Sequence, residues 1–398
     1  MKSIESKVCI VGSGPAGLVT SLFLSKDKIP HLLVDKSVFP RDKVCGENMD
    51  GRVASVLNRV SPGIIDELKS KGLVKETWDF NIVLPKGKVP ISFGKNNAPR
   101  LLTKRIDFDH FLYEKATSST YCEVHDGLAI NNYRYDGDRI VFEGKGFEVT
   151  ASIGVIACGH QSSFLKNRKE EEKLFFFNRL YYKNQTGFKD NQIQTYYFAK
   201  PAKCCLLIVP LPNNEFNIDI GISKNGYKNL KIRLEDLLQI LIAGDKHLKK
   251  WFNTAQVIDK VRGIHIPVAS KYKHFSDRNM VYVGGAAFCV NPITGMGIGN
   301  AMIMAEIAAG EIAAWIKKDS FLAEHTHSYE IKARKKLRNV FVLNGALNLF
   351  FRNLETATPF LLFAVKSKYV IKILSTSSLV NSIRKPTFYL KKLFNREK

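Results

Sequence analysis

The sequence is poor in acidic residues and lacks the spaced cysteines and histidines of a metal site. Its 398 residues include 37 Asp and Glu against 60 Lys and Arg, which gives a formal net charge of +23. No C-x-x-C pair and no ligand-like histidine spacing indicates zinc, so we expect no metal centre. The 7 cysteines are odd in number and scattered, which favours reduced thiols in a cytoplasmic protein over a disulfide framework.

Long apolar runs are also missing. A membrane-spanning helix needs roughly 18 consecutive apolar residues. The nearest approach, from Leu343 to Val365, is interrupted by Arg352 and Glu355. The first strand-like segment begins so close to Met1 that we expect no signal peptide. These absences predict a cytoplasmic protein that is not integral to a membrane.

The excess of basic charge has no nucleic-acid-binding module to accompany it, so we expect no nucleic-acid partner. The strongest charge asymmetry lies near the end of the chain, where basic residues are interleaved with apolar ones. These basic residues are Lys366, Lys368, Lys372, Arg384, Lys385, Lys391, Lys392, Arg396 and Lys398. Such a segment fits peripheral contact with an anionic membrane surface. A solvated helical tail is the alternative.

The most informative stretch of the sequence runs from Val8 to Asp35. An apolar run, Val8–Val11, reads as a buried parallel strand. It leads into a G-x-G-x-x-G turn over residues 12–17, then into a helical pattern, and then into a second short strand, His31–Val34. The acid Asp35 ends that strand. This order of strand, glycine turn, helix, strand and acid predicts a dinucleotide-binding βαβ unit.

Each part of this unit has a physical task. Gly12 permits the tight turn, Gly14 lets the backbone approach a pyrophosphate, and Gly17 lets helix and strand pack closely. The helix N-terminus offers unpaired N–H groups to the phosphates, and Asp35 can accept hydrogen bonds from a ribose. The residues that we expect to bind the dinucleotide here are Gly12, Gly14, Pro15, Ala16, Gly17, Asp35 and Lys36. No second fingerprint is present, so we expect no dedicated NAD(P)H domain.

The rest of the chain alternates between helical and strand-like patterns. Helical periodicity covers Gly51–Leu57, Ile64–Lys71, Thr103–Ala116, Leu230–Ala243 and Asn300–Ile316. Buried strands are expected over Ser152–Ala157 and Asn279–Val283, and a meander over Tyr121–Val149. An antiparallel sheet is expected from Phe80–Pro85, Val89–Phe93, Leu174–Tyr182, Gln192–Phe198, Cys204–Pro210 and Glu215–Ile222.

Four further segments carry motifs. Residues 39–46 read FPRDKVCG, and Arg105 with Asp109 reads R-x-x-x-D. Residues 157–162 read ACGHQS, and residues 284–298 contain GGAA followed by PITGMGI. With the glycine turn, these segments resemble the p-hydroxybenzoate-hydroxylase-like flavoproteins, especially their geranylgeranyl-reductase branch. The F-P-R-x-K-x-C-G segment is the most specific of the matches, which are spread over roughly residues 7–330.

The resemblance implies FAD as the cofactor, with the flavin ring carrying the redox chemistry. It implies that the arginines hold FAD, that Cys45 and Gly46 border the flavin, and that a helix begins against the flavin after the last motif. The FAD-site residues implied in this way are Arg41, Cys45, Gly46, Arg105, Gly285, Pro292, Gly295, Gly297 and Ile298. Cys45 is also the candidate catalytic residue, as a proton donor; the alternative is a small buried thiol that only packs.

Three departures from the family pattern affect this interpretation. Cys158 replaces the acid of A-D-G, and Gly285 replaces the acid of G-D-A-A, which in the family hydrogen-bonds the ribityl chain. Losing that bond removes roughly 1.5–3 kcal/mol. The aromatic G-Y-x-W-x-F-P pattern of prenyl reductases is replaced by Cys204–Pro210, which keeps only the proline. We therefore expect an apolar pocket without its aromatic wall.

The resulting fold class is α/β, or α+β overall. It combines a Rossmann-type FAD-binding domain, an interleaved antiparallel substrate sheet and C-terminal helices. We expect the FAD-binding domain to comprise residues 1–75, 101–168 and 273–330. The substrate domain would comprise residues 76–100 and 169–272, and a basic helical region residues 331–398.

The function implied by the resemblance is an FAD-dependent oxidoreductase that reduces carbon–carbon double bonds of a hydrophobic isoprenoid, polyene or lipid-like substrate. The reductant would be NAD(P)H docking transiently or an electron-donor protein. A flavin monooxygenase that uses NAD(P)H and O2 is the first alternative. A flavin-binding scaffold without catalysis is the second, suggested by the two missing acids. The halogenase motif W-x-W-x-I-P is absent, because the three tryptophans lie far apart.

Overall fold

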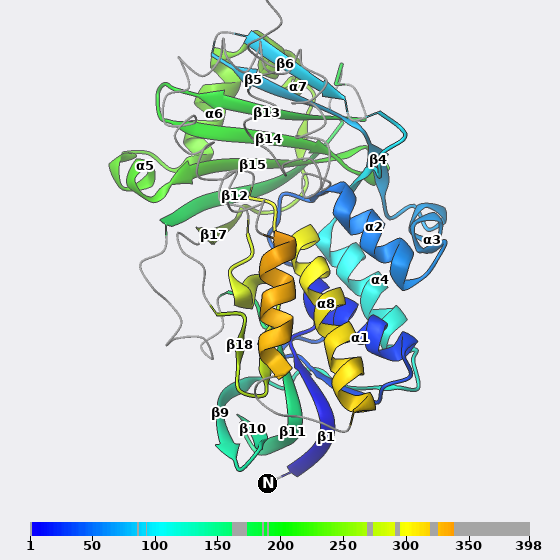
Figure 1. The fold of residues 1–398 in the computed structure, drawn as a ribbon. Coiled ribbons are helices and arrows are strands. Elements are labelled where there is room, and N and C mark those ends of the chain that lie inside the picture. Colours follow the sequence, from blue (N-terminus) through cyan, green and yellow to red (C-terminus); the bar gives the residue numbers. More distant parts are fainter. Residues whose placement is uncertain are drawn as a thin grey trace, which may run out of the picture.

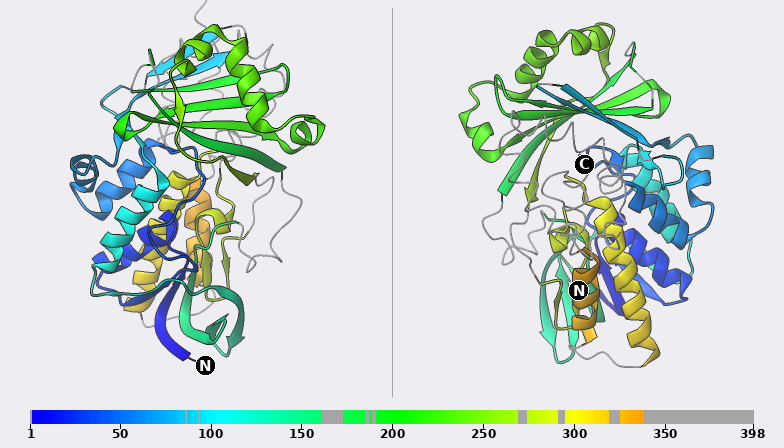
Figure 2. Two further views of the ribbon diagram at one scale, coloured as in Figure 1. Left: turned by 180° about the vertical axis from the view of Figure 1, so that it is seen from behind. Right: turned by 45° about the horizontal axis from the view of Figure 1, so that its top comes forward.

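The computed structural model describes residues 2–85, 87–92, 94–160, 173–184, 187–188, 191–268, 274–290, 295–318 and 325–337. Two bodies are stacked in it, each built on an 8-stranded sheet (Figure 1). The lower body in that view contains a parallel sheet with helices packed on it, and the upper body contains an antiparallel sheet. The helices of the upper body lie on the face directed away from the lower body, as the right-hand view of Figure 2 shows. The other face of the upper sheet is therefore turned toward the lower body.

The parallel sheet follows the order β18-β19-β11-β1-β2-β8, and only the edge pair β18–β19 on this path is antiparallel in the described chain. The strands are β1 (Lys2–Val11), β2 (His31–Val34), β8 (Cys122–His125), β11 (Phe147–Ile156), β18 (Ser276–Asp277) and β19 (Met280–Tyr282). A hairpin of β9 (Ile130–Asp136) and β10 (Arg139–Gly144) continues the sheet from β11. The central strands are apolar along their buried ends because layers cover both faces.

Five of the helices in the described chain pack beside this sheet. They are α1 (Pro15–Lys26), α2 (Gly51–Val60), α3 (Ile64–Ser70), α4 (Arg105–Thr117) and α8 (Ile298–Lys317). Helices α1 and α8 pack against each other and against the core of the parallel sheet. The N-termini of α1 and α8 lie at the same end of the lower body, below the upper sheet (Figure 1).

The antiparallel sheet follows the order β16-β12-β15-β14-β13-β5-β6, with β17 also paired to β12, and among the described strands only the pair β13–β5 in it is parallel. Its strands are β5 (Asp79–Leu84), β6 (Gly87–Ser92), β12 (Lys173–Lys183), β13 (Gln192–Phe198), β14 (Cys204–Pro210), β15 (Glu215–Ser223), β16 (Gln256–Val257) and β17 (Arg262–Val268). The helices on its outer face are α5 (Lys224–Asn229), α6 (Leu234–Gly244) and α7 (Lys246–Phe252). Alternate residues of each strand form a core with these helices, and the residues between them face the lower body.

A three-stranded sheet joins the two bodies: β3 (Asn48–Met49), β7 (Arg100–Leu102) and β4 (Lys75–Thr77). The chain enters the upper sheet after β4 and returns through β7. The expected strand Ser152–Ala157 is the second half of the longer β11, because hairpin pairing extends it back to Phe147. The expected helix Leu230–Ala243 begins only at Leu234, with Arg233 as its N-cap.

The mixed α/β class with one parallel and one antiparallel sheet is as predicted. Residues 325–337 are helical, and the basic segment beyond residue 337 lies outside the described residues. None of the helices that the structure describes combines the length and the apolar composition required to cross a bilayer.

Candidate functional site

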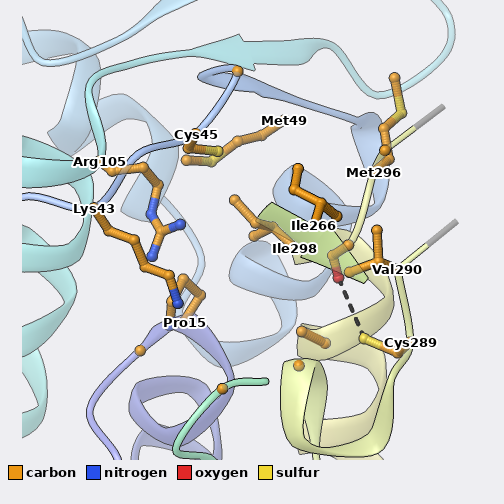
Figure 3. A pocket seen from close by; sticks show the side chains of 18 of the residues that line it. Pro15, Lys43, Cys45, Met49, Arg105, Ile266, Cys289, Val290, Met296 and Ile298 are labelled. Carbon is orange, nitrogen blue, oxygen red and sulfur yellow. Dashed lines mark hydrogen bonds between the residues drawn. The ribbon is translucent and has the colours of Figure 1, made fainter. Parts of the chain in front are cut away.

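A pocket lies between the two bodies, beneath the inward face of the antiparallel sheet (Figure 3). It is formed by the start of α1, the loop before β3, the loop after β11, the start of α8 and the strands β14 and β17. The residues of the predicted site that line it are Gly14, Pro15, Ala16, Cys45, Gly46, Arg105, Gly285, Gly295, Gly297 and Ile298. Segments far apart in the sequence therefore meet at one cavity.

The glycine turn forms the floor of the pocket at the start of α1. Gly12 has a φ of +108°, and a Cβ there would lie 2.7 Å from the backbone of Ala157. A Cβ at Gly17 would lie 1.8 Å from the Gly12 carbonyl oxygen, so this glycine allows α1 to pack against the turn. At Gly14 the atom nearest to an added Cβ would be a guanidinium nitrogen of Arg41, at 3.8 Å, which leaves the helix N-terminus open to the pocket.

The acid at the end of β2 supports the turn from behind. Asp35 is buried and accepts hydrogen bonds from the backbone N–H groups of Ser13 and Ser37, at 2.5 and 2.8 Å. Lys36 beside it is exposed. Neither Asp35 nor Lys36 is among the residues that line the pocket. Their assignment to a ribose therefore stays a prediction.

Two arginines of the predicted site share one buried carboxylate. Arg105 binds Asp109 through two hydrogen bonds of 2.7 and 2.6 Å, and Arg41 reaches the same carboxylate at 2.9 Å. The Asp109 side chain is completely buried. Although burial opposes the charged form, Asp109 raises the pKa of the Arg105 guanidinium. The acid of the R-x-x-x-D motif thus fixes both cations beside the glycine turn.

Lys43 is a lining residue that sequence analysis did not assign to the site. Burial and the neighbouring Arg105 and Arg41 lower the pKa of its ammonium group to about 8. No described carboxylate lies within ion-pair distance of it, and Figure 3 shows the amine directed toward Pro15. Lys43 belongs to the FPRDKVCG segment, so this motif could have been used to predict it as a site residue.

Cys45 and Gly46 lie where the loop before β3 meets the sheet. The Cys45 side chain lies beside Met49 in the pocket (Figure 3). Burial raises the pKa of its thiol, and Arg105, which is within hydrogen-bonding reach, opposes that rise. A Cβ at Gly46 would lie 3.1 Å from Leu207 of β14, so the glycine allows the loop to approach the sheet closely.

The start of α8 forms the opposite wall. Gly297 is its N-cap, without a side-chain capping bond, and Ile298 is its first residue. The Gly297 carbonyl oxygen accepts a long hydrogen bond from the Cys289 thiol, at 3.7 Å. Gly285 packs against the loop after β11, where a Cβ would lie 3.1 Å from Gly159. This close approach accompanies the loss of the family's acid at that position, and Pro292 lies outside the described residues.

The inward face of the sheet forms the apolar roof. Leu207, Ile264 and Ile266 line the pocket directly. In register with Ile264, the same sheet face carries Phe177, Gly221, Cys205 and Tyr197 on four successive strands. A Cβ at Gly221 would lie 2.3 Å from the Phe177 ring. No Phe, Tyr or Trp is among the described residues that line the pocket, which agrees with the expected apolar pocket without an aromatic wall. Phe177 and Tyr197 lie on the same sheet face, on either side of Cys205.

A buried polar network links the pocket loop to the sheet. Glu47 accepts hydrogen bonds from the Tyr181 hydroxyl and from the backbone N–H of Arg105. Arg179 lies 3.5 Å from Glu47 and makes a stronger pair of 2.6 Å with Asp42. Burial raises the pKa of Glu47 to about 8 in spite of these donors. The network holds residues 42–47 against β12.

Glu47 gives folding stability a pH dependence. Its raised pKa means that the folded protein keeps a proton that the unfolded chain releases near pH 4.5. The contribution of this group is therefore complete below that pH and is lost as pH rises toward about 8. We expect Glu47→Gln to flatten the decline, by at most about 1.4 kcal/mol per pH unit. Urea unfolding across this range measures the effect, with the exposed Glu5→Gln as the control; parallel curves for Glu47→Gln and the parent protein would contradict it.

Of the remaining lining residues, Ala157, Gly159, His160 and Met296 belong to motif segments but were not assigned to the site. The lining residues outside the motifs are Asn48, Met49, Asp50, Leu207, Ile264, Ile266, Cys289, Val290, Gly299 and Ala301. Strand alternation was the available signal for Leu207, Ile264 and Ile266, but it does not say which of two faces meets the other body.

The residues present fit FAD. Two helix N-termini without side-chain caps open on one cavity, where their free N–H groups suit a diphosphate. The cations Lys43 and Arg105 line the same cavity, and the open space at Gly14 leaves room for a ligand against the backbone. The apolar roof suits a flat ring and a hydrophobic substrate.

Comparisons with known proteins agree with this geometry. The family described as FAD binding domain matches residues 5–226, and the family described as lycopene cyclase protein matches residues 232–381. A menaquinone reductase of Mycobacterium tuberculosis is 24% identical over 77% of this chain and 76% of its own length. A digeranylgeranylglycerophospholipid reductase of Methanococcus vannielii is 26% identical over 85% of this chain and 86% of its own.

Solved structures share the fold. A geranylgeranyl bacteriochlorophyll reductase-like protein from Thermoplasma acidophilum superposes with a TM-score of 0.78 at 18% identity, covering 98% of this chain and 100% of its own. A flavin-dependent brominase gives a TM-score of 0.76 at 19% identity, covering 93% of each chain. The fold is thus common to reductases and halogenating enzymes.

Proposed function

This chain belongs to the FAD binding domain family and is an FAD-dependent oxidoreductase, and we propose a reaction for it. We propose that it reduces carbon–carbon double bonds of a hydrophobic isoprenoid substrate. The observation that carries the proposal is the pocket itself, in which cations and two helix N-termini lie below an apolar sheet face. The names of the relatives support the substrate class, since two act on an isoprenoid lipid or a quinone by name.

FAD, when bound and reduced, supplies a hydride to the substrate. The glycine turn at Gly12, Gly14 and Gly17, with Pro15 and Ala16, would hold the diphosphate. Arg41 and Arg105 would fix the loop around it, and Asp35 with Lys36 would serve the adenosine end. The glycines around the start of α8, with Ile298, would face the flavin. Cys45 and Gly46 would border both the flavin and the substrate.

The division of the chain into domains follows from these roles. The FAD-binding domain would comprise residues 1–75, 101–168 and 273–330, and the substrate domain residues 76–100 and 169–272. The pairing of β5 with β13 supports this division, because it places residues 79–84 in the sheet of the second group.

Reductant and substrate must reach the pocket from outside. We assign reduction to NAD(P)H docking transiently or to an electron-donor protein. A hydrophobic substrate would be taken from a membrane surface by a cytoplasmic, peripherally bound enzyme, with the excess of positive charge favouring anionic lipid.

The proposal is tested on the FAD-loaded protein reduced under anaerobic conditions. Addition of a short-tailed menaquinone or a geranylgeranyl lipid is expected to reoxidise the flavin. Tandem mass spectrometry of the product, after reoxidation of any quinol, should place the added H2 in the isoprenoid chain. Flavin that reoxidises only when O2 is admitted, with an oxygenated or halogenated product, would favour the monooxygenase or halogenase chemistry of the shared fold. A protein that takes up no FAD would favour the scaffold alternative.

Cys45 should matter to turnover more than to folding. If its thiol gives a proton to the substrate, Cys45→Ala and Cys45→Ser should lower kcat about a hundredfold, the lower range for a general acid. FAD affinity and the thermal midpoint should change little, because the side chain is small. Cys204→Ala, on the helix-facing side of β14, is the matched control. Unchanged kcat in both Cys45 variants would end the catalytic role of this residue.

A further inference from the structure

A buried carboxyl lies directly behind the loop that carries Cys45. Asp219 is 3% exposed and belongs to β15, on the face of the sheet that is turned toward the pocket. In the sheet register it lies opposite Leu207 of β14, which lines the pocket, and opposite Arg179 of β12. The motifs of the sequence do not include this residue, and it has no part in the proposed hydride transfer.

Asp219 is connected to the Cys45–Gly46 loop in two ways, indirectly through Asn217 and directly at Gly46. The Asn217 side-chain amide donates to Asp219 at 2.7 Å and also to the Cys45 carbonyl oxygen at 3.4 Å. A Cβ at Gly46 would lie 3.3 Å from the Asp219 carboxyl oxygen, so loop backbone and carboxyl are in close contact. Asn217 is fully buried, and its own amide oxygen has no described partner. The pair Asn217–Asp219 thus clamps the loop from the sheet side.

The charges around Asp219 leave it without a dedicated cation. The groups that face it are Arg179 of β12, Cys205 of β14, Asn217 of its own strand, and Cys45 and Glu47 of the loop. Arg179 is already engaged by Asp42 at 2.6 Å, by Glu47 at 3.5 Å and by Asp259 at 3.8 Å. Among the described residues, Asp219 has no ion pair within the same distances. A buried acid in that position favours its protonated form.

The direction of the Asp219 pKa agrees with this geometry. Burial raises it to about 7, against the donors Asn217 and Arg179. Burial also raises the pKa of the Cys45 thiol, and the negative charges of Glu47 and Asp219 add to that rise. The protonation states of Asp219 and Cys45 are therefore coupled.

Reduction of an alkene needs a proton as well as a hydride, and a buried carboxyl, Asp219, lies behind the partly exposed Cys45. We propose that Asp219 is the positioning residue that supplies the proton of Cys45: its carboxyl holds a proton behind the Cys45–Gly46 loop and restores the thiol after the thiol has protonated the substrate. This inference rests on the proposed function for its chemical role, and on the clamp through Asn217 for its placement.

The step balances with one proton from solvent as the further reactant. The hydride forms one C–H bond at one alkene carbon, the S–H bond of Cys45 breaks, and its proton forms the second C–H bond. The O–H bond of Asp219 then breaks as the S–H bond re-forms. The carboxylate regains a proton from water between turnovers.

The first test uses alkylation of Cys45 by iodoacetamide, followed by mass spectrometry of its peptide over a range of pH. It needs neither FAD nor substrate, because the rate reports the thiolate fraction. Below about pH 6 the parent and Asp219→Asn should react alike, since the acid is then protonated. At pH 8 the variant should react about twofold to tenfold faster, because an ionised neighbour no longer opposes the thiolate.

Glu330→Gln is the control. Glu330 is also a buried acid, at 5% exposed, but it binds the backbone N–H of Phe275 and the Arg334 side chain instead of the pocket loop, so the alkylation profile of this variant should follow that of the parent. Should Asp219→Asn fail to fold, Glu47→Gln decides: the inflection near pH 7 should persist in this variant if it belongs to Asp219, and its disappearance would assign it to Glu47. A single inflection, or an Asp219→Asn profile identical to that of the parent, would overturn the proposal.

The second test uses turnover of the short-tailed menaquinone. Asp219→Asn should lower kcat at pH 7 about tenfold to a hundredfold with KM within twofold, since a missing proton donor affects the chemical step. In the parent, kcat should fall as pH rises through about 7, and this limb should be absent in the variant. If the parent enzyme does not turn over any isoprenoid, the proposed function fails, while the alkylation experiment still decides the coupling. Turnover by the variant equal to that of the parent would refute the role in proton supply.

Discussion

Asp109→Ala is expected to lower the free energy of unfolding by about 3–5 kcal/mol, the cost of leaving a buried ion pair without one partner. The effect should be large because this carboxylate is completely buried and binds both Arg105 and Arg41. Without it, two cations remain beside the glycine turn with no compensating charge among their described contacts. FAD affinity should fall as well, because the loop after β2 loses its anchor on α4. Urea unfolding and FAD titration measure the two effects.

The control for this prediction lies on the same helix. Asp107 is only partly buried, and its pKa is raised by burial, so removal of its carboxyl should cost less than about 1 kcal/mol. An equal loss in Asp107→Ala and Asp109→Ala would show that the shared carboxylate has no special role. Retention of full stability by Asp109→Ala would contradict the account of the arginine pair.

Gly17→Ala is expected to be similarly damaging. The added Cβ would lie 1.8 Å from the Gly12 carbonyl oxygen, and no rotamer change can relieve a clash with backbone. Helix α1 must therefore move away from the turn, which should cost about 3 kcal/mol, the upper range for overpacking. The same movement should withdraw the helix N-terminus from the diphosphate and lower FAD affinity. Thermal unfolding and fluorescence titration with FAD report the two losses.

Gly310→Ala provides the matched control, because it is also a glycine within a long helix. A Cβ there meets nothing within 4 Å, so the substitution should stabilise α8 by up to about 1 kcal/mol through its helix propensity. Opposite signs for the two variants would locate the effect in the packing of α1 on the turn. A stabilised Gly17→Ala would contradict the role assigned to that glycine.

Local patterns in the sequence were enough for the first βαβ unit and for the motif loops. Gly12, Gly14 and Gly17 are recognisable because their spacing is dictated by a single turn. The Cys45–Gly46 segment was found because its motif is contiguous. The glycine turn and the Cys45–Gly46 motif each consist of residues close together in the chain, so their sequence spacing determines their geometry.

Contacts between strands far apart in the chain could not be predicted from such local patterns. Alternation in β14 identified a strand, but did not show that Leu207 faces the pocket or that Phe177 and Tyr197 flank Cys205. The start of α6 was misplaced because Leu230–Arg233 continues the apolar periodicity without being helical. Asp219 was passed over because a single acid in a strand has no local signature.

The sequence by itself determined the cofactor class, the α/β architecture and the identity of the residues around the glycine turn, since these depend on short-range geometry. Only the tertiary structure decided which strand faces meet the lower body, which carboxylate holds both arginines, and which buried acid lies behind Cys45. The physical reason is that burial and charge balance depend on contacts between segments far apart in the chain. No local spacing encodes those contacts.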